Sequence, residues 1–122
     1  MNLQKLPQAF SICQISDVSQ VDFTRPFVFL SKTDEEISLV CETGAVPSNT
    51  LAREDGWRAL RVQGVLEFSL VGILASFSTI LAQGGISIFA VSTYNTDYLF
   101  IKEDVFARAC AVLSCAGYAI LE

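Results

Sequence analysis

The chain has 122 residues, enough for one domain with a buried core or for two very small ones. Its net charge is −5 and it contains no long run of Lys or Arg, which argues against binding to nucleic acid or to an anionic membrane surface. It contains no His, so a Ser-His or Cys-His nucleophile cannot be built from this chain alone.

The first half of the chain is predicted to form mainly strands. Three strands are expected, at residues 10–15, 27–31 and 37–41. The polar segment 32–36 joins the last two and is typical of a hairpin tip. Residues 16–25 are too short and polar for a full helix, and residues 44–56, with Pro47 and Gly56, are predicted to form a loop.

The second half predicts an alternation of strands and helices. The expected elements are a strand at 57–65, a helix at 70–84, strands at 86–93 and 96–102, a helix from 103 that Gly117 closes, and a last strand at 118–121. This β-α-β-β-α-β order is that of the ferredoxin-like split unit, so an α+β fold is predicted. We interpret the first half as a degenerate copy of the same unit that has lost its helices. This gives domains at 1–56 and 57–122.

The uncharged segment 70–91 is long enough to be weighed as a membrane span, since about 20 apolar residues suffice. Its apolar residues, however, fall on one helical face, with Ser76, Thr79 and Gln83 off it. Gly84-Gly85 is placed to end the helix, and the residues after it are β-branched and typical of a strand. We therefore expect no membrane contact.

The four cysteines, Cys13, Cys41, Cys110 and Cys115, form no C-x-x-C pair, so a zinc site is poorly supported. We interpret them as buried free thiols, which pack as small apolar side chains. Such thiols fit a reducing, cytoplasmic setting, and the first residues lack the long apolar stretch of a secretory signal. Trp57 is expected in the core or at a subunit contact, and Arg53, Arg58 and Arg61 at a solvated edge.

Two segments are candidates for binding a small molecule. Residues 67–72 lead into the first helix, whose unpaired N–H groups and partial positive charge suit a carboxylate, although an N-cap at Ser69 and a packing role for Gly72 explain them more simply. Residues 92–97, Ser-Thr-Tyr-Asn-Thr-Asp, join two strands and can simply make the turn. Asp97 lies where a strand starts, and it can pair with a ligand's ammonium or guanidinium group or remain a solvated turn residue.

Together these segments resemble the ACT domain, in the form found in aspartokinases and in the arginine sensors of a growth-control kinase pathway. The resemblance covers residues 57–118 and rests on Gly72, Ala82, the Gly-Ile-Ser-Ile run at 85–88 and Ser92-Thr93. It implies an amino-acid ligand at an interface between two ACT units, gripped by the loop before the first helix and by the second strand. The ligand-binding residues that it implies are Ser69, Val71, Gly72, Ile73, Ser87, Ile88, Thr93, Tyr94 and Asp97.

The arginine-sensor branch is similar at Gly72-Ile73 and at residues 92–97, but it has acidic residues in the loop where this chain has Ser69 and Leu70. Arginine is therefore in doubt as the ligand, and a smaller or apolar amino acid is an alternative. That branch also has four ACT units in one chain, and this chain has at most two, so the interface needs a second chain or the degenerate half.

We predict a non-catalytic sensor, without a cofactor, that binds a free amino acid or a related small metabolite and forms a homodimer. Two alternatives stay open. One is a structural or protein-interaction ACT module that dimerises without a ligand. The other is a small enzyme that uses Asp97 or Glu67 with a tyrosine, for which the sequence shows no nucleophile–base pair.

Overall fold

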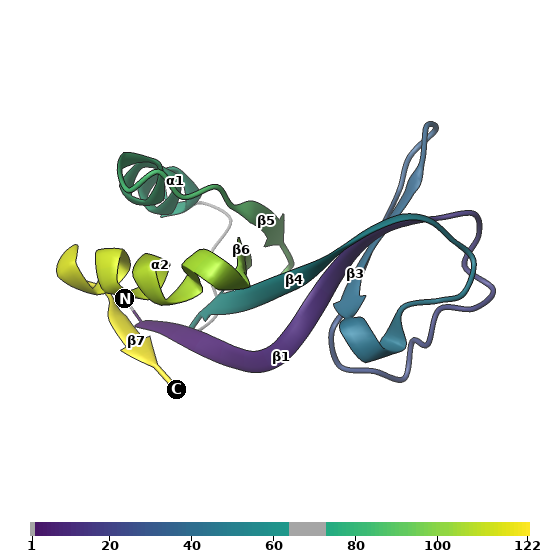
Figure 1. The fold of residues 1–122 in the computed structure, drawn as a ribbon, viewed down its shortest axis with the longest axis horizontal. Coiled ribbons are helices and arrows are strands. Elements are labelled where there is room, and N and C mark those ends of the chain that lie inside the picture. The colour runs from purple at the N-terminus through teal and green to yellow at the C-terminus, as the bar shows by residue number, and fades with distance from the viewer. Residues whose placement is uncertain (1, 64–72) are drawn as a thin grey trace. The chain divides into compact units, whose positions relative to one another are not determined.

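The computed structural model describes residues 2–63 and 73–122, with the side chain of Ile73 left out. It divides into two compact units, and we describe each by itself. The strand unit is Gln8–Trp57, and the helical unit combines Met1–Pro7 with Arg58–Glu122. Two long strands, β1 (Asn2–Ile15) and β4 (Thr50–Val62), contribute residues to both units (Figure 1).

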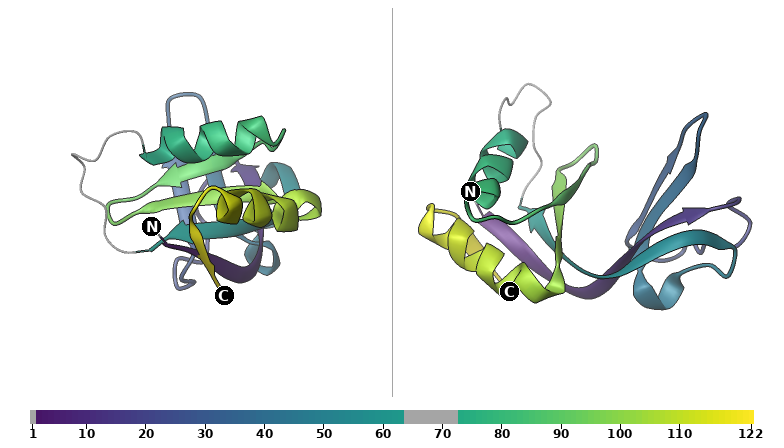
Figure 2. Two further views of the ribbon diagram at one scale, coloured as in Figure 1. Left: turned by 90° about the vertical axis from the view of Figure 1, so that its left-hand side faces the viewer. Right: turned by 45° about the horizontal axis from the view of Figure 1, so that its top comes forward.

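The helical unit has the predicted α+β architecture. After β4 come α1 (Ile73–Gln83), β5 (Phe89–Ser92), β6 (Asp97–Lys102), α2 (Glu103–Cys115) and β7 (Ala119–Leu121). Its strands lie in the order β7-β1-β4-β6-β5, and both helices cover the same face of this sheet (Figure 2). The βαββαβ prediction is thus confirmed, with one addition that the sequence did not predict: the start of β1 lies between β4 and β7.

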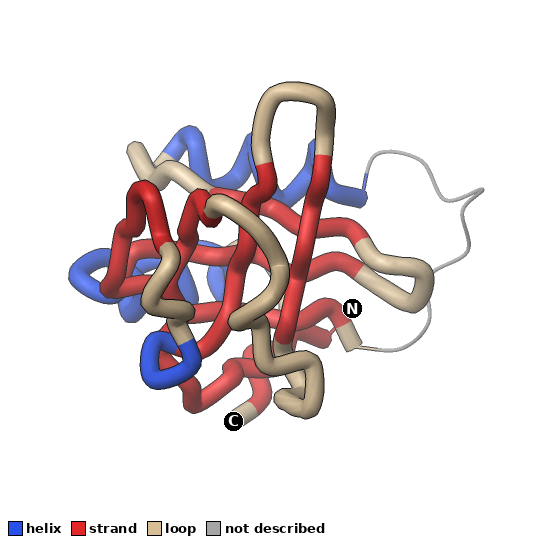
Figure 3. The backbone as a smooth tube through the Cα atoms, turned by 90° about the vertical axis from the view of Figure 1, so that its right-hand side faces the viewer, coloured by secondary structure: helices blue, strands red, loops and turns tan. Residues whose placement is uncertain are grey.

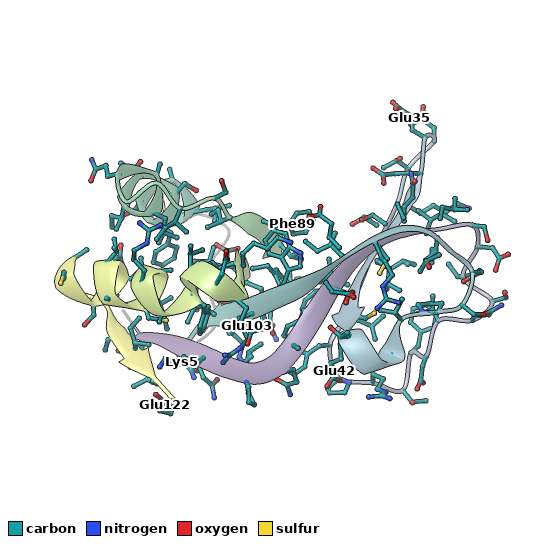
Figure 4. The ribbon with its side chains drawn as sticks, viewed as in Figure 1. Lys5, Glu35, Glu42, Phe89, Glu103 and Glu122 are labelled. Atoms are coloured by element: carbon teal, nitrogen blue, oxygen red, sulfur yellow. The ribbon has the colours of Figure 1, made fainter. Side chains whose placement is uncertain are left out.

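This added strand pairs in parallel with β7, Asn2 opposite Ala119 and Gln4 opposite Leu121. On its other side, the Gln63 N–H donates to the Asn2 carbonyl at 2.9 Å. Lys5 and Glu122 form an ion pair at 3.0 Å that further joins β1 to the end of the chain (Figure 4). Because the Glu122 side chain is highly exposed, backbone pairing rather than this ion pair holds the strand in place.

The core of the helical unit lies between the sheet and the two helices. Alternate residues of the central strands, Leu60 and Val62 on β4 and Leu99 and Ile101 on β6, point to it. The helices contribute the apolar faces expected from their 3.6-residue period. The buried helix residues are Phe77, Leu81, Phe106, Ala109, Cys110 and Leu113, and all are members of one cluster.

Both helices end as their glycines predict. At the end of α1 the Ile86 N–H donates to the Leu81 carbonyl and the Gly85 N–H to the Ala82 carbonyl, with Gly85 at φ +72°. At the end of α2 the Tyr118 N–H donates to the Leu113 carbonyl, and Gly117 has φ +104°. This pairing is the Schellman motif, which needs a residue that tolerates positive φ.

The strand unit adds β2 (Val28–Lys32), β3 (Ile37–Glu42) and a single 3₁₀ turn, η1 (Thr43–Ala45). Its strands lie in the order β2-β3-β1-β4. Figure 3 shows the backbone coloured by secondary structure, with strands in red and loops in tan. Cys13, Ile15, Leu39 and Cys41 form a buried cluster within it. No α-helix occurs between residues 8 and 57, all of which the structure describes. This agrees with the interpretation of the first half as a unit that has lost its helices.

The hairpins of the two units repeat each other with an offset of 60 residues. Adding 60 to the bounds of β3 gives those of β6, and the two strands have the same pattern of buried positions. The registers also coincide, since Phe29 pairs with Val40 in one hairpin and Phe89 with Phe100 in the other. This correspondence supports the interpretation of the first half as a degenerate copy.

Three boundaries differ from the sequence predictions. The strand predicted at 10–15 begins at Asn2, and β4 begins at Thr50, inside the segment predicted as a loop. The exposed, polar residues at the start of β4 have no apolar alternation that could have indicated a strand. The strand predicted at 86–93 is shorter, because Ile86 completes the cap of α1.

Candidate ligand-binding site

The predicted site residues are divided between two segments of the helical unit. Ser69, Val71 and Gly72 lie outside the described residues, and Ile73 is the first residue of α1. The other five lie on or just before the β5–β6 hairpin: Ser87, Ile88, Thr93, Tyr94 and Asp97. The described part of the candidate site is therefore this hairpin.

The turn of the hairpin is closed by Thr93 and Thr96. The Thr93 N–H donates to the Thr96 carbonyl at 2.9 Å, and the Thr93 hydroxyl donates to the same oxygen at 2.8 Å. The Thr96 N–H in turn donates to the Thr93 hydroxyl at 3.3 Å. The Thr93 hydroxyl is thus already bonded on both sides, and its first role is to hold the turn.

Thr96 also fixes the hairpin to the rest of the unit. Its hydroxyl donates to the Val62 carbonyl at the end of β4, at 2.8 Å, and its side chain is only 6% exposed. Sequence reasoning did not single out this residue. The sequence contains only a weak signal for this hydrogen bond, because a Thr between Asn95 and Asp97 is expected to be an ordinary solvated turn residue.

Tyr94 and Asp97 are the two hairpin residues with side chains suited to a ligand. The Tyr94 side chain is 79% exposed at the tip. Asp97, half-buried, is the first residue of β6 and pairs across the hairpin with Ser92. Among residues 2–63 and 73–122, no Lys or Arg forms an ion pair with the Asp97 carboxylate. Its charge is therefore available to a cationic group.

Ser87 and Ile88 precede β5. The Ser87 side chain is exposed, whereas Ile88 is partly buried and packs against the core of the helical unit. The position of Ile88 is thus explained by packing, and only its backbone groups stay candidates for contact with a ligand.

A family model for the ACT domain matches residues 52–115, which is more than half of the chain. The chain belongs to the ACT domain family. The match includes α1, the β5–β6 hairpin and α2, so the hairpin described above is part of the ACT domain itself.

Solved structures share the fold over nearly the whole chain. A protein of Agobacterium tumefaciens is 29% identical with a TM-score of 0.86, covering 98% of this chain and 91% of its own. A Vibrio cholerae protein of unknown function, described as a possible transport protein, is 18% identical with a TM-score of 0.73, covering 92% and 86%. The ligand-free regulatory subunit of aspartate kinase from Thermus thermophilus is 8% identical with a TM-score of 0.67, covering 96% and 97%. No curated protein matches the sequence.

The three arginines near the start of the ACT match differ from one another. Arg61 is half-buried rather than solvated, and it donates to the Gln4 side-chain oxygen at 2.7 Å. Arg53 is exposed and pairs with Asp55 at 3.0 Å, as expected of a solvated edge. Arg58 does not fit that prediction, because it is half-buried, lies 4.5 Å from the centre of the Phe106 ring and donates to the Leu6 carbonyl at 3.2 Å. A guanidinium stacked on an aromatic ring contributes to packing as well as charge.

The cysteine prediction is confirmed at three positions and wrong at the fourth. Cys13, Cys41 and Cys110 are buried free thiols, but Cys115 is exposed. Five residues separate Cys110 from Cys115 on α2, which turns the second side chain about 140° away from the apolar face. Trp57 is buried on its strand, as expected.

No set of three His, Cys, Asp or Glu side chains is placed to hold a metal ion in the parts of the ACT protein that the structure describes. Within the same residues, none of the helices is long and apolar enough to cross a membrane.

Proposed function

We propose that this ACT protein is a non-catalytic regulatory module that binds a free amino acid or a related small metabolite. The observation that carries the proposal is the ACT match over residues 52–115, whose hairpin presents a carboxylate without an ion-pair partner among the described residues. In this proposal Asp97 binds the ligand's ammonium or guanidinium group. Ser69, Val71 and Gly72, together with Ile73 at the start of α1, receive its carboxylate.

The ligand in this proposal lies at an interface between ACT units of two copies of the chain. Thr93 and Thr96 support this arrangement indirectly, because they fix the turn that positions Tyr94 and Asp97. A rigid turn lowers the entropy lost when a ligand is bound. The exposed Tyr94 ring then covers the ligand or contacts the second copy. We place this protein in the cytoplasm, where free amino acids are available to it.

A second candidate is an ACT module that mediates protein contact without a ligand. The observation that favours it is the position of β5, which ends the strand order of the helical unit in the described structure. An edge strand offers backbone groups to which another chain can pair. Under this alternative, Asp97 is a solvated residue at the end of the turn and has no ligand.

Thermal unfolding of the purified chain against each common L-amino acid, at millimolar concentration, tests the proposal. A ligand at about 100 times its dissociation constant adds roughly 2.7 kcal/mol of stability, which raises the midpoint by several degrees. We expect one amino acid, or one chemical group of them, to give such a shift.

The matched variants are Asp97→Asn and Glu35→Gln. Both remove one carboxylate from a hairpin, but Glu35 lies at the exposed tip of the β2–β3 hairpin (Figure 4). We expect Asp97→Asn to abolish the ligand-induced shift and Glu35→Gln to retain it. A flat response to the whole panel by a chain that still dimerises would favour the interaction module instead.

A further inference from the structure

Two cysteines lie side by side in the strand unit, and the proposed ligand site uses neither. In the antiparallel β1–β3 register, Cys13 is opposite Leu39 and Ser11 is opposite Cys41. The two cysteines are therefore diagonal neighbours on the same face of the sheet. Both residues are only 2% exposed, and both belong to the buried cluster of the strand unit.

Packing alone does not require a thiol at the position of Cys41. The 60-residue correspondence between the hairpins places Ile101 of the helical unit at the position of Cys41. Ile101 is fully buried in its own cluster, just as Cys41 is in the cluster of the strand unit. An aliphatic side chain thus fills the equivalent place, and the contact between two thiols is specific to the strand unit.

A positively charged side chain lies near both thiols. Burial raises the pKa of both thiols, that of Cys41 to about 11. At both thiols this rise in pKa is opposed by the nearby Arg53 guanidinium, which stabilises a thiolate, and at Cys13 the Asp55 carboxylate adds to the rise. The Arg53 side chain is 41% exposed and pairs with Asp55 at 3.0 Å.

We propose that Cys13 and Cys41 form a reversible intramolecular disulfide when the protein is exposed to hydrogen peroxide. In the first step the Cys13 sulfur attacks one peroxide oxygen, the O–O bond breaks, and a sulfenic acid and one water form. In the second step the Cys41 sulfur attacks the Cys13 sulfur, the S–O bond breaks, and a second water leaves. The two thiol hydrogens end in the waters, and the two electrons that the thiols lose reduce the peroxide.

The geometry predicts a slow reaction and an easily reduced product. Cα atoms of diagonal neighbours lie about 7–8 Å apart, compared with about 4.4–6.8 Å across a disulfide, so β1 and β3 must move closer at this point. A bond that forms against such a displacement is strained and is therefore readily reduced. Because both sulfurs are buried, peroxide reaches them only when the strand unit opens locally.

The test is peroxide treatment of the folded, full chain, followed by mass spectrometry of the intact protein and of its tryptic peptides under non-reducing conditions. Trypsin cleavage after Lys32 separates Cys13 from Cys41. We expect a product that has lost two hydrogen atoms and contains the two cysteine peptides linked to each other. Dithiothreitol should return this product to the starting mass.

The exposed Cys115 is replaced first, since a disulfide between two copies at that residue would complicate the spectrum. In the Cys115→Ser protein, Cys41→Val should abolish the loss of two hydrogens, whereas Cys110→Ala, which removes another buried thiol, should leave it unchanged. The unsubstituted chain gives the peptide map even if Cys41→Val does not fold. Oxidation that yields only sulfinic acids, or only Cys115 disulfides, while the protein stays folded would overturn the proposal.

Discussion

Thr96 shows how much of the candidate site depends on a single hydroxyl group. Its bond to the Val62 carbonyl is buried, so Thr96→Val keeps the shape of the side chain but leaves a carbonyl without its donor. We expect a loss of about 1–3 kcal/mol in the free energy of unfolding, measured by urea denaturation. Thr79→Val, the same change at an exposed position of α1, is the control and should cost far less.

Buried thiols make a second prediction at this scale. Burial raises the pKa of Cys41 from its ordinary value of 9.0 to about 11, so the folded protein holds this proton more tightly than the unfolded chain. The free energy of unfolding is unaffected below about pH 9 and falls as pH rises from about 9 to 11, because the unfolded chain loses the proton first.

Chemical denaturation between pH 8 and 11 measures this slope. Cys41→Val should make it shallower, and it should not vanish, because burial also raises the pKa of Cys13 and Cys110. Cys115→Ser, at an exposed position, should leave it unchanged. An equal slope in the Cys41→Val protein would contradict the assignment of the effect to this thiol.

The ends of the two helices give a prediction at the scale of elements. Gly85 and Gly117 have φ +72° and +104°, in the region where a side chain is strained. We expect Gly117→Ala and Gly85→Ala each to lower the free energy of unfolding by about 1–2 kcal/mol, measured by denaturation. The control is Gly44→Ala, because Gly44 has neither a positive φ nor an atom within 4 Å of an added Cβ.

The elements also show which features could be predicted from sequence. Local signals predicted α2 well: Glu103 and Asp104 begin it, four apolar residues follow the helical period, and Gly117 ends it. The same holds for the hairpin tips, where polar residues separate two mainly apolar runs. These features depend on residues close together in the chain.

Features that depend on distant parts of the chain were missed. The start of β4 is exposed and polar, and it is a strand because it pairs with β1 and not because of its own pattern. The insertion of residues 2–4 between β4 and β7 is another pairing of distant segments. At the candidate site, the hydrogen bond from Thr96 to Val62 could not be predicted, because it too joins distant parts of the chain. The exposure of Tyr94, in contrast, could be predicted from its place in a turn.

At the scale of the whole molecule, the correspondence of the two hairpins has a functional consequence. The position of Asp97 is occupied by Ile37 in the strand unit, because adding 60 to 37 gives 97. The strand unit thus lacks the carboxylate to which we assign the ligand's cationic group, and it lacks a helix whose N-terminus could receive a carboxylate. One chain then supplies one complete set of ligand-binding groups.

In the proposed interface, a second copy of the chain supplies the other side. Ligand binding and dimerisation are therefore expected to be linked. A ligand that contacts both copies favours the dimer over the monomer, because it binds only the assembled form tightly. We expect sedimentation velocity to show that the amino acid with the largest thermal shift moves the monomer–dimer equilibrium toward the dimer.

The Asp97→Asn protein is the control for this linkage, and its equilibrium should not respond to the same amino acid. If the ligand stabilises the chain against heat but leaves the monomer–dimer equilibrium unchanged, each copy binds it independently. The site then lies within one chain, and the role of Tyr94 at a contact between copies is wrong. A shift of the equilibrium in both proteins would instead remove Asp97 from the site and leave the start of α1 as the ligand's main contact.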